Sequence, residues 1–187
     1  TDSARLNDDL YYQRLWYNHL DSALNIPIER LQDINTQDTF FYHFYPIYSW
    51  IIYFQQSDNT IAQLKAGGFN LIHEERTIDS INAVYDFYKD VKFTNDYNVI
   101  AYLDAIRKAQ EIMILPPPAT TIEEVASSKM LTNKKVFTQN NKQSFQQLYN
   151  LLGNSKTSLM SCIVFQLKYQ ERVKRLLTYL QKKYDID

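Results

Sequence analysis

Glycine and proline are scarce in this chain, and that scarcity is the strongest restriction on its fold. Only three glycines and five prolines occur among 187 residues. Antiparallel β folds use such residues often, because they supply the backbone conformations of tight turns. Long helices need far fewer turns. We therefore predict an all-α fold, and the hydrophobic share of 45% is large enough to build a core.

The spacing of apolar residues predicts an irregular helical-repeat bundle, similar to an α-solenoid, of about 8–10 helices. From Asp8 to Leu24, for example, apolar residues recur at intervals near the helical period of about 3.6. The other predicted helices cover residues 27–34, 38–54, 58–67, 77–88, 96–115, 120–131, 141–152 and 157–184.

Several residues are expected to mark helix ends. Asp38 has a side chain suited to cap the helix that follows it. Pro46 is expected to kink or divide that helix, because proline lacks the N–H that a helix interior needs. Gly153 is expected to stop a helix, and the polar segment 132–142 is predicted to be a loop.

The length is typical of one domain, so residues 1–187 are predicted to form a single helical domain. The triple proline at 116–118 is a potential sub-boundary within it, because helices end before proline. It would separate an acidic body, residues 1–115, from a basic helical part, residues 119–187.

The net charge of −1 hides a strong asymmetry along the chain. Residues 1–125 hold nine Lys or Arg against 18 Asp or Glu, a net of −9. Residues 126–187 hold 11 against three, a net of +8. Such asymmetry points to contact of the basic part with a polyanion. The alternative is a solvated helix face, or ion pairs with the acidic part of the same chain.

The candidate residues for contact with nucleic acid or an acidic partner are the cations of the last predicted helix. They are Lys168, Arg172, Lys174, Arg175, Lys182 and Lys183. Aromatic residues are interleaved with the basic residues of this last third and are able to stack on bases. These are Phe137, Tyr169, Tyr179 and Tyr184.

The longest apolar run covers residues 40–54 and includes His43 and Pro46. Its 15 residues are fewer than the about 20 that a transmembrane helix needs, so no membrane span is expected. We interpret it as a buried helix whose surplus aromatic surface meets a protein partner. The candidate interface residues are Tyr45, Tyr48, Trp50 and Tyr53. A ligand pocket with His43 or Tyr48 facing inward is the other interpretation.

Motifs for catalysis, metal binding or cofactor binding are not found in the sequence. His19, His43 and His73 are far apart and show no metal-ligand spacing. No glycine-rich phosphate loop or nucleophile elbow occurs. Cys162, the single cysteine, lies in an apolar helix and is expected to be a small buried side chain. We therefore predict no catalytic, cofactor-binding or metal-binding residues, and a protein that is not an enzyme.

Two stretches carry a family resemblance. In residues 80–110, an apolar helix with Tyr85 precedes an Asn95-Asp96 pair and an Ala-Tyr-Leu step. In residues 141–184, a helix with Phe145 precedes a long helix with a basic, apolar-spaced tail. Together the two stretches resemble, over about 40% of the chain, the helical-repeat domain of GANP-type mRNA-export scaffolds, which are relatives of PCI-domain subunits. This resemblance implies a non-enzymatic nuclear scaffold that holds partner proteins and contacts RNA.

The sequence thus leads to a functional hypothesis with one alternative. The hypothesis is a helical scaffold or adaptor subunit of a larger assembly that works in mRNA export or RNA handling. Its partners would be other protein subunits, with RNA at the basic C-terminal part. The alternative is a protein-only module of the kinetochore, tethering or viral host-interaction type. The single cysteine and the absence of a signal pattern in the first ten residues favour an intracellular location, and the resemblance favours the nucleus over the cytoplasm.

Overall fold

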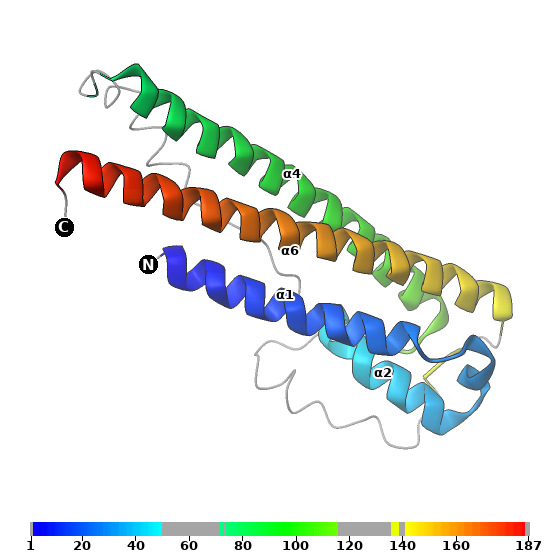
Figure 1. Cartoon of the computed structure of the whole chain (residues 1–187). Helices are drawn as coiled ribbons and strands as arrows, with labels where there is room; N and C mark the ends of the chain where they lie inside the picture. Colours follow the sequence, from blue (N-terminus) through cyan, green and yellow to red (C-terminus); the bar gives the residue numbers. More distant parts are fainter. Residues whose placement is uncertain (1, 50–71, 73, 116–135, 139–140, 186–187) are drawn as a thin grey trace.

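The described part of the chain is almost entirely helical. The computed structural model describes residues 2–49, 72, 74–115, 136–138 and 141–185. Its elements are α1 (Asp2–Leu24), the short 3-10 helix η1 (Ile28–Gln32), α2 (Ile34–Ser49), α4 (Glu75–Ile112) and α6 (Lys142–Tyr184) (Figure 1). The all-α prediction is confirmed. These elements do not show the repeated helix pairs of a solenoid, so that part stays a prediction.

The long helices α4 and α6 lie side by side in opposite directions (Figure 1). Ser155 donates to the carbonyl of Ala101 at 3.0 Å, and Cys162 donates to the carbonyl of Thr94 at 3.3 Å. Moving seven residues forward along α6 therefore means moving seven residues back along α4. This spacing is two helical turns, so the same faces of the two helices stay in contact along their length.

Helix α1 packs against α6 and reaches α4. Asn7 on α1 accepts a hydrogen bond from Gln170 on α6 at 3.1 Å. The ring of Trp16 stacks on Tyr102 of α4, with centroids 6.3 Å apart. The ends of α4 and α6 extend past the N-terminus of α1 (Figure 1). The packing of α1 thus covers only part of the α4 and α6 pair.

The main core joins residues from both sides of the proline segment 116–118, which lies outside the described residues. Phe40 and Phe44 of α2 are fully buried, as are Leu148 and Leu152 of α6. Tyr102 and Ala105 of α4 belong to the same cluster. The acidic and basic parts of the sequence therefore share one interior.

Two predicted interruptions are wrong, because α4 and α6 are each continuous. Residues 89–95 were expected to separate two helices, but they contain neither glycine nor proline, and Asn95 is buried inside α4. Gly153 was expected to stop a helix, but its φ is not positive and α6 passes through it. Packing between α4 and α6 on both sides of these positions outweighs the weak local propensities.

The predicted start of the aromatic helix is also wrong. Helix α2 begins at Ile34, and Asp38 is buried within it. Asp33 provides the cap instead, since its carboxylate accepts hydrogen bonds from the backbone N–H and the hydroxyl of Thr36, each at 2.9 Å. Division at Pro46 does not occur, because α2 continues through this buried residue to Ser49.

The predicted loop at 132–142 contributes to the core where it is described. Val136 and Phe137 are each 1% exposed, and Phe137 pairs with Met113 through an antiparallel β-bridge. The side-chain oxygen of Gln37 accepts from the backbone N–H of Val136 at 3.2 Å. A short extended segment is thus held between α2 and the end of α4.

Replacing Gly153 with alanine is predicted to stabilise the protein. A Cβ atom added at this position meets no atom within 4 Å. Glycine inside a helix costs about 0.5–1 kcal/mol relative to alanine. We expect the free energy of unfolding of Gly153→Ala to rise by about that amount, measured by urea denaturation. A fall in stability would show that the side of α6 at Gly153 is occupied.

Replacing the buried Gln166 with methionine is also predicted to stabilise the protein. Gln166 is fully buried, and neither side-chain amide atom has a hydrogen-bond partner in the described part of the chain. Leaving a buried polar group unpaired costs about 1–3 kcal/mol. We expect Gln166→Met to raise Tm, whereas the matched change at the exposed Gln147 should leave Tm nearly unchanged. A lower Tm for Gln166→Met would show that the amide is paired in solution.

Candidate macromolecular interface

Five of the six predicted basic residues lie on one face of α6. Lys168, Arg172, Arg175, Lys182 and Lys183 follow a spacing of about one and two helical turns, so they form a stripe along the helix. We call these five residues the basic stripe. Lys174 is roughly 120° around the helix from Lys168 and faces a different side.

Two residues of the basic stripe interact with carboxylates of this chain, and a third with an aromatic ring. Arg175 pairs with Glu171 one turn earlier on α6, and both side chains remain largely exposed. The guanidinium of Arg172 lies 4.0 Å above the ring of Phe87 on α4. Lys183 pairs with Glu74. Lys168 and Lys182 are exposed and have no carboxylate partner within the described ranges.

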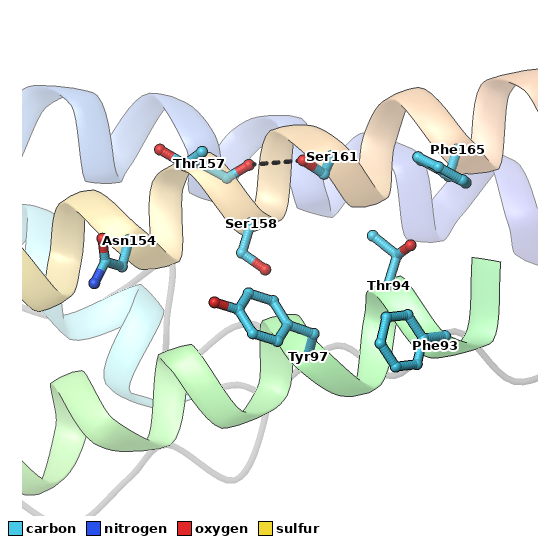
Figure 2. A pocket seen from close by; sticks show the side chains of 8 residues that line it. All are labelled: Phe93, Thr94, Tyr97, Asn154, Thr157, Ser158, Ser161 and Phe165. Carbon is cyan, nitrogen blue, oxygen red and sulfur yellow. Dashed lines mark hydrogen bonds between the residues drawn. The ribbon is translucent and has the colours of Figure 1, made fainter. Parts of the chain in front are cut away.

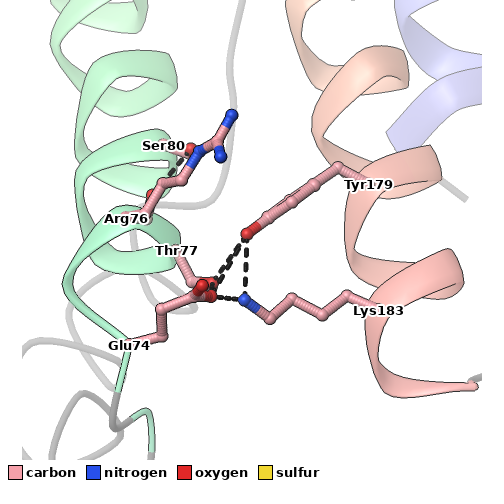
Figure 3. Close-up of polar contacts among 6 residues, drawn as sticks. All are labelled: Glu74, Arg76, Thr77, Ser80, Tyr179 and Lys183. Carbon is pink, nitrogen blue, oxygen red and sulfur yellow. Dashed lines mark hydrogen bonds and ion pairs between the residues drawn. The ribbon is translucent and has the colours of Figure 1, made fainter.

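Lys183 belongs to a polar cluster that joins the end of α6 to the start of α4. Figure 3 shows Lys183 and Tyr179 of α6 meeting Glu74 and Thr77 beside the first turn of α4. Thr77 donates to Glu74 at 2.6 Å, and the Tyr179 hydroxyl donates to the same carboxylate at 3.2 Å. Lys183 is thus committed to an intramolecular contact.

Other basic residues of the last third also pair with the acidic part of the chain. Lys142 lies 2.9 Å from Glu29, and Lys156 pairs with Asp21. With the pair of Lys183 and Glu74, three cations of residues 126–187 meet carboxylates of residues 1–125. Part of the charge asymmetry along the sequence is therefore neutralised by ion pairs within the chain. Two of the aromatic residues predicted to stack on bases are also unavailable to a partner, because Phe137 and Tyr169 are buried. Tyr184 is 44% exposed.

A groove of about 430 Å³ runs between α4 and α6 on the side of the basic stripe. Figure 2 shows Phe93 and Tyr97 of α4 on one side of it and the hydroxyl side chains of Thr157, Ser158 and Ser161 on the other. The remaining lining residues are Thr94, Asn154 and Phe165. None of these eight lining residues is an acid, a histidine, a cysteine or a lysine, so the groove presents apolar and hydroxyl surface rather than acid–base chemistry.

Three large apolar side chains of α4 project beside this groove. Phe93, Tyr97 and Ile100 are 74%, 60% and 59% exposed. Their spacing places them on one face of α4. We call these three residues the α4 ridge. The sequence predicts the exposed aromatic surface in residues 40–54 instead, because the spacing of the α4 ridge residues fits a buried helical stripe equally well.

The predicted aromatic interface lies partly outside the described residues, which exclude Trp50 and Tyr53. Tyr45 and Tyr48 are half-buried and pack against the core of α2. Tyr48 stacks on Phe44 with ring centroids 6.3 Å apart. These two tyrosines keep only part of their surface for a partner, and their role as an interface stays a prediction.

The fold brings together two histidines that are far apart in sequence. The Nδ1 atoms of His19 on α1 and His43 on α2 are 3.3 Å apart. Burial lowers the pKa of both rings, and the charge of His43 lowers the pKa of His19 further. Helical spacing does not reveal this pair, because its members are on different helices. The ring of His43, which the alternative interpretation turned toward a ligand pocket, thus has a partner within the protein.

The structure also bears on the single cysteine, on metal binding and on membrane spanning. Cys162 is 1% exposed, as expected, and burial raises the pKa of its thiol to about 12. Within the described ranges, no three His, Cys, Asp or Glu side chains gather in a way that can hold a metal ion. No helix there has the length and apolar character of a membrane span.

The histidine pair predicts a pH-dependent stability. Both pKa values lie below the ordinary 6.5 in the folded protein, so the unfolded chain binds protons first on acidification. The free energy of unfolding should therefore be constant above about pH 7 and fall as the pH drops from about 6.5 toward the lowered values. We expect the double variant His19→Gln/His43→Gln to lose less Tm between pH 7.5 and pH 5 than the native protein does. A comparison at pH 8, where both rings are neutral, separates any packing effect. Equal losses in both proteins would contradict this assignment.

Comparison of this chain with protein-family models, with curated proteins and with solved structures found no match.

Proposed function

We propose that this chain is a non-enzymatic helical scaffold or adaptor subunit of a larger assembly, and that the C-terminal half of α6 contacts RNA. One observation supports the RNA contact most directly. Lys168, Arg172, Arg175 and Lys182 are exposed on one face of α6 and extend over about 21 Å of helix. Each strand of a duplex carries one phosphate about every 3.4 Å along the helix axis, so several phosphates of one strand fit along this length.

The chemistry of this surface suits backbone contact more than base recognition. Lysine and arginine contribute affinity that does not depend on sequence and decreases with salt. Tyr184 is the exposed aromatic residue at the end of α6, and it is able to stack on a base. We therefore propose weak sequence preference and strong salt dependence.

The proposed place of action is the nucleus. The family resemblance of residues 80–110 and 141–184 implies mRNA export or another RNA-handling process, with the protein in the nucleus. Protein subunits of such an assembly would be the main partners. This part of the proposal depends on the resemblance rather than on the geometry of α6.

Charge reversal on the basic stripe tests the RNA contact. We expect Arg175→Glu/Lys182→Glu to weaken binding of single-stranded RNA and to lower the slope of log K against log salt by about 1.4, since each lost phosphate contact removes about 0.7. Filter binding at several salt concentrations measures both quantities. Lys92→Glu/Lys174→Glu is a matched control, because it changes the net charge equally at exposed positions outside the basic stripe. Equal loss in the two variants, or no binding by the native protein, would contradict the RNA contact.

A protein-only module of the kinetochore, tethering or viral host-interaction type is the second proposal. The observation that favours it is the set of ion pairs between the basic and acidic parts, Lys142 with Glu29, Lys156 with Asp21, and Lys183 with Glu74. These pairs reduce the charge left for a polyanion. Affinity purification with mass spectrometry distinguishes the two proposals, because RNA-handling subunits should be recovered only under the first.

A further inference from the structure

The α4 ridge leaves a large apolar surface without cover in the described structure. Phe93, Tyr97 and Ile100 are each more than half exposed and are spaced one turn apart. Single exposed apolar residues are common, but a contiguous group bordering a groove marks an interaction site. Tyrosine and phenylalanine supply much contact area with little side-chain entropy.

The facing surface of α6 is built from small side chains. Asn154, Thr157 and Ser161 follow one another by about one turn along the groove (Figure 2). The hydroxyls of Thr157 and Ser161 donate to carbonyls of their own helix, at 3.0 and 3.2 Å. They therefore need no outside acceptor when another helix covers them. We call these three residues the α6 floor.

A buried polar atom also faces this groove. Ser158 is 5% exposed and lines the groove, and its Oγ atom has no hydrogen-bond partner among the described residues. Figure 2 shows its side chain directed toward Tyr97. An unpaired buried hydroxyl is costly. A partner that brings a polar group to the groove would satisfy it.

The register of α4 against α6 within the chain fixes which residues would meet if a second copy covered this surface. Within the chain, Ala101 lies beside Ser155 and Thr94 beside Cys162. A two-fold axis parallel to these helices places α4 of a second copy over α6 of the first at the same height. The second α4 ridge then lies opposite residues 156–163, on and beside the α6 floor. Large side chains thus meet small ones.

The same operation matches charges. Asp86 and Asp90 precede Phe93 on the ridge face of α4. At the register above, Asp90 lies opposite residue 166 of the other α6, beside Lys168. Asp86, which pairs with Lys89 of its own helix at 2.7 Å, lies opposite residue 170, beside Arg172. Because the axis is two-fold, each of these contacts forms twice. One surface therefore carries both halves of a self-complementary interface.

We propose that a second copy of this chain docks on the α4 and α6 face and forms a two-fold four-helix arrangement. The α4 ridge of each copy covers the α6 floor of the other, with Asp90 next to Lys168 across the interface. Lys168 and Arg172 belong to both proposed surfaces, whereas Arg175 and Lys182 lie farther along α6, outside the matched segment. The RNA test at Arg175 and Lys182 and the dimer test at Phe93 and Tyr97 can therefore fail separately.

Sedimentation of the full chain over a range of concentrations tests the dimer. The native protein should have twice the 22.2 kDa mass of one chain, and Phe93→Glu/Tyr97→Glu should be monomeric with unchanged helix content by circular dichroism. Tyr11→Glu is the matched control, since Tyr11 is a 64% exposed aromatic residue on α1. It should remain dimeric. A monomeric native protein would overturn the proposal and leave this face to a different protein, and so would equal weakening by Tyr11→Glu.

A charge exchange tests the geometry itself. Asp90→Lys and Lys168→Asp, each alone, place like charges together twice and should weaken the dimer by about tenfold or more. An equal mixture of the two variants restores opposite charges at both contacts of a mixed dimer. We expect the mixture to regain native affinity within about threefold. Failure of the mixture to form a dimer would overturn the proposed two-fold arrangement.

Discussion

The antiparallel packing of α4 on α6 is the interaction on which the rest of the structure depends. Helices in proteins gain most of their stability from packing rather than from propensity. The outer ends of α4 and α6 extend past the N-terminus of α1 (Figure 1). There the cluster of Glu74, Thr77, Tyr179 and Lys183 joins the two ends (Figure 3). The inner ends share the main core with α1 and α2.

This packing also organises the surface. It turns the α6 floor, the α4 ridge and the basic stripe toward the same side of the molecule, although these groups come from helices that are far apart in sequence. The two proposed activities share Lys168 and Arg172 but otherwise use different parts of that side. A second copy covers the segment near Tyr97 and Ser161, whereas Arg175 and Lys182 lie toward the outer end. A dimer would therefore carry this outer pair of cations twice, once on each copy.

Several predictions from the sequence are confirmed because they rest on strong local signals. Apolar spacing placed the end of α1 at Leu24 and the end of α6 at Tyr184, both as observed. Other predictions failed where local signals are weak. Gly153 does not end the helix, because the segments of α6 on both sides of it pack on neighbouring helices. Asp33 and Asp38 have equally suitable capping side chains, so the sequence alone does not show which of them starts α2. The spacing of Phe93 and Tyr97 shows that they share a face, but not whether that face is buried.

The sequence by itself determined that this chain is helical, and it located the acidic and basic segments, because turn residues, periodicity and charge are read directly from residue order. Only the tertiary structure decided how those segments are used. It brought His19 to His43, paired Lys183 with Glu74, and left the α4 ridge exposed. The physical reason is that contacts between helices depend on register and rotation. These are set by the packing of the whole core, and no short segment contains that information.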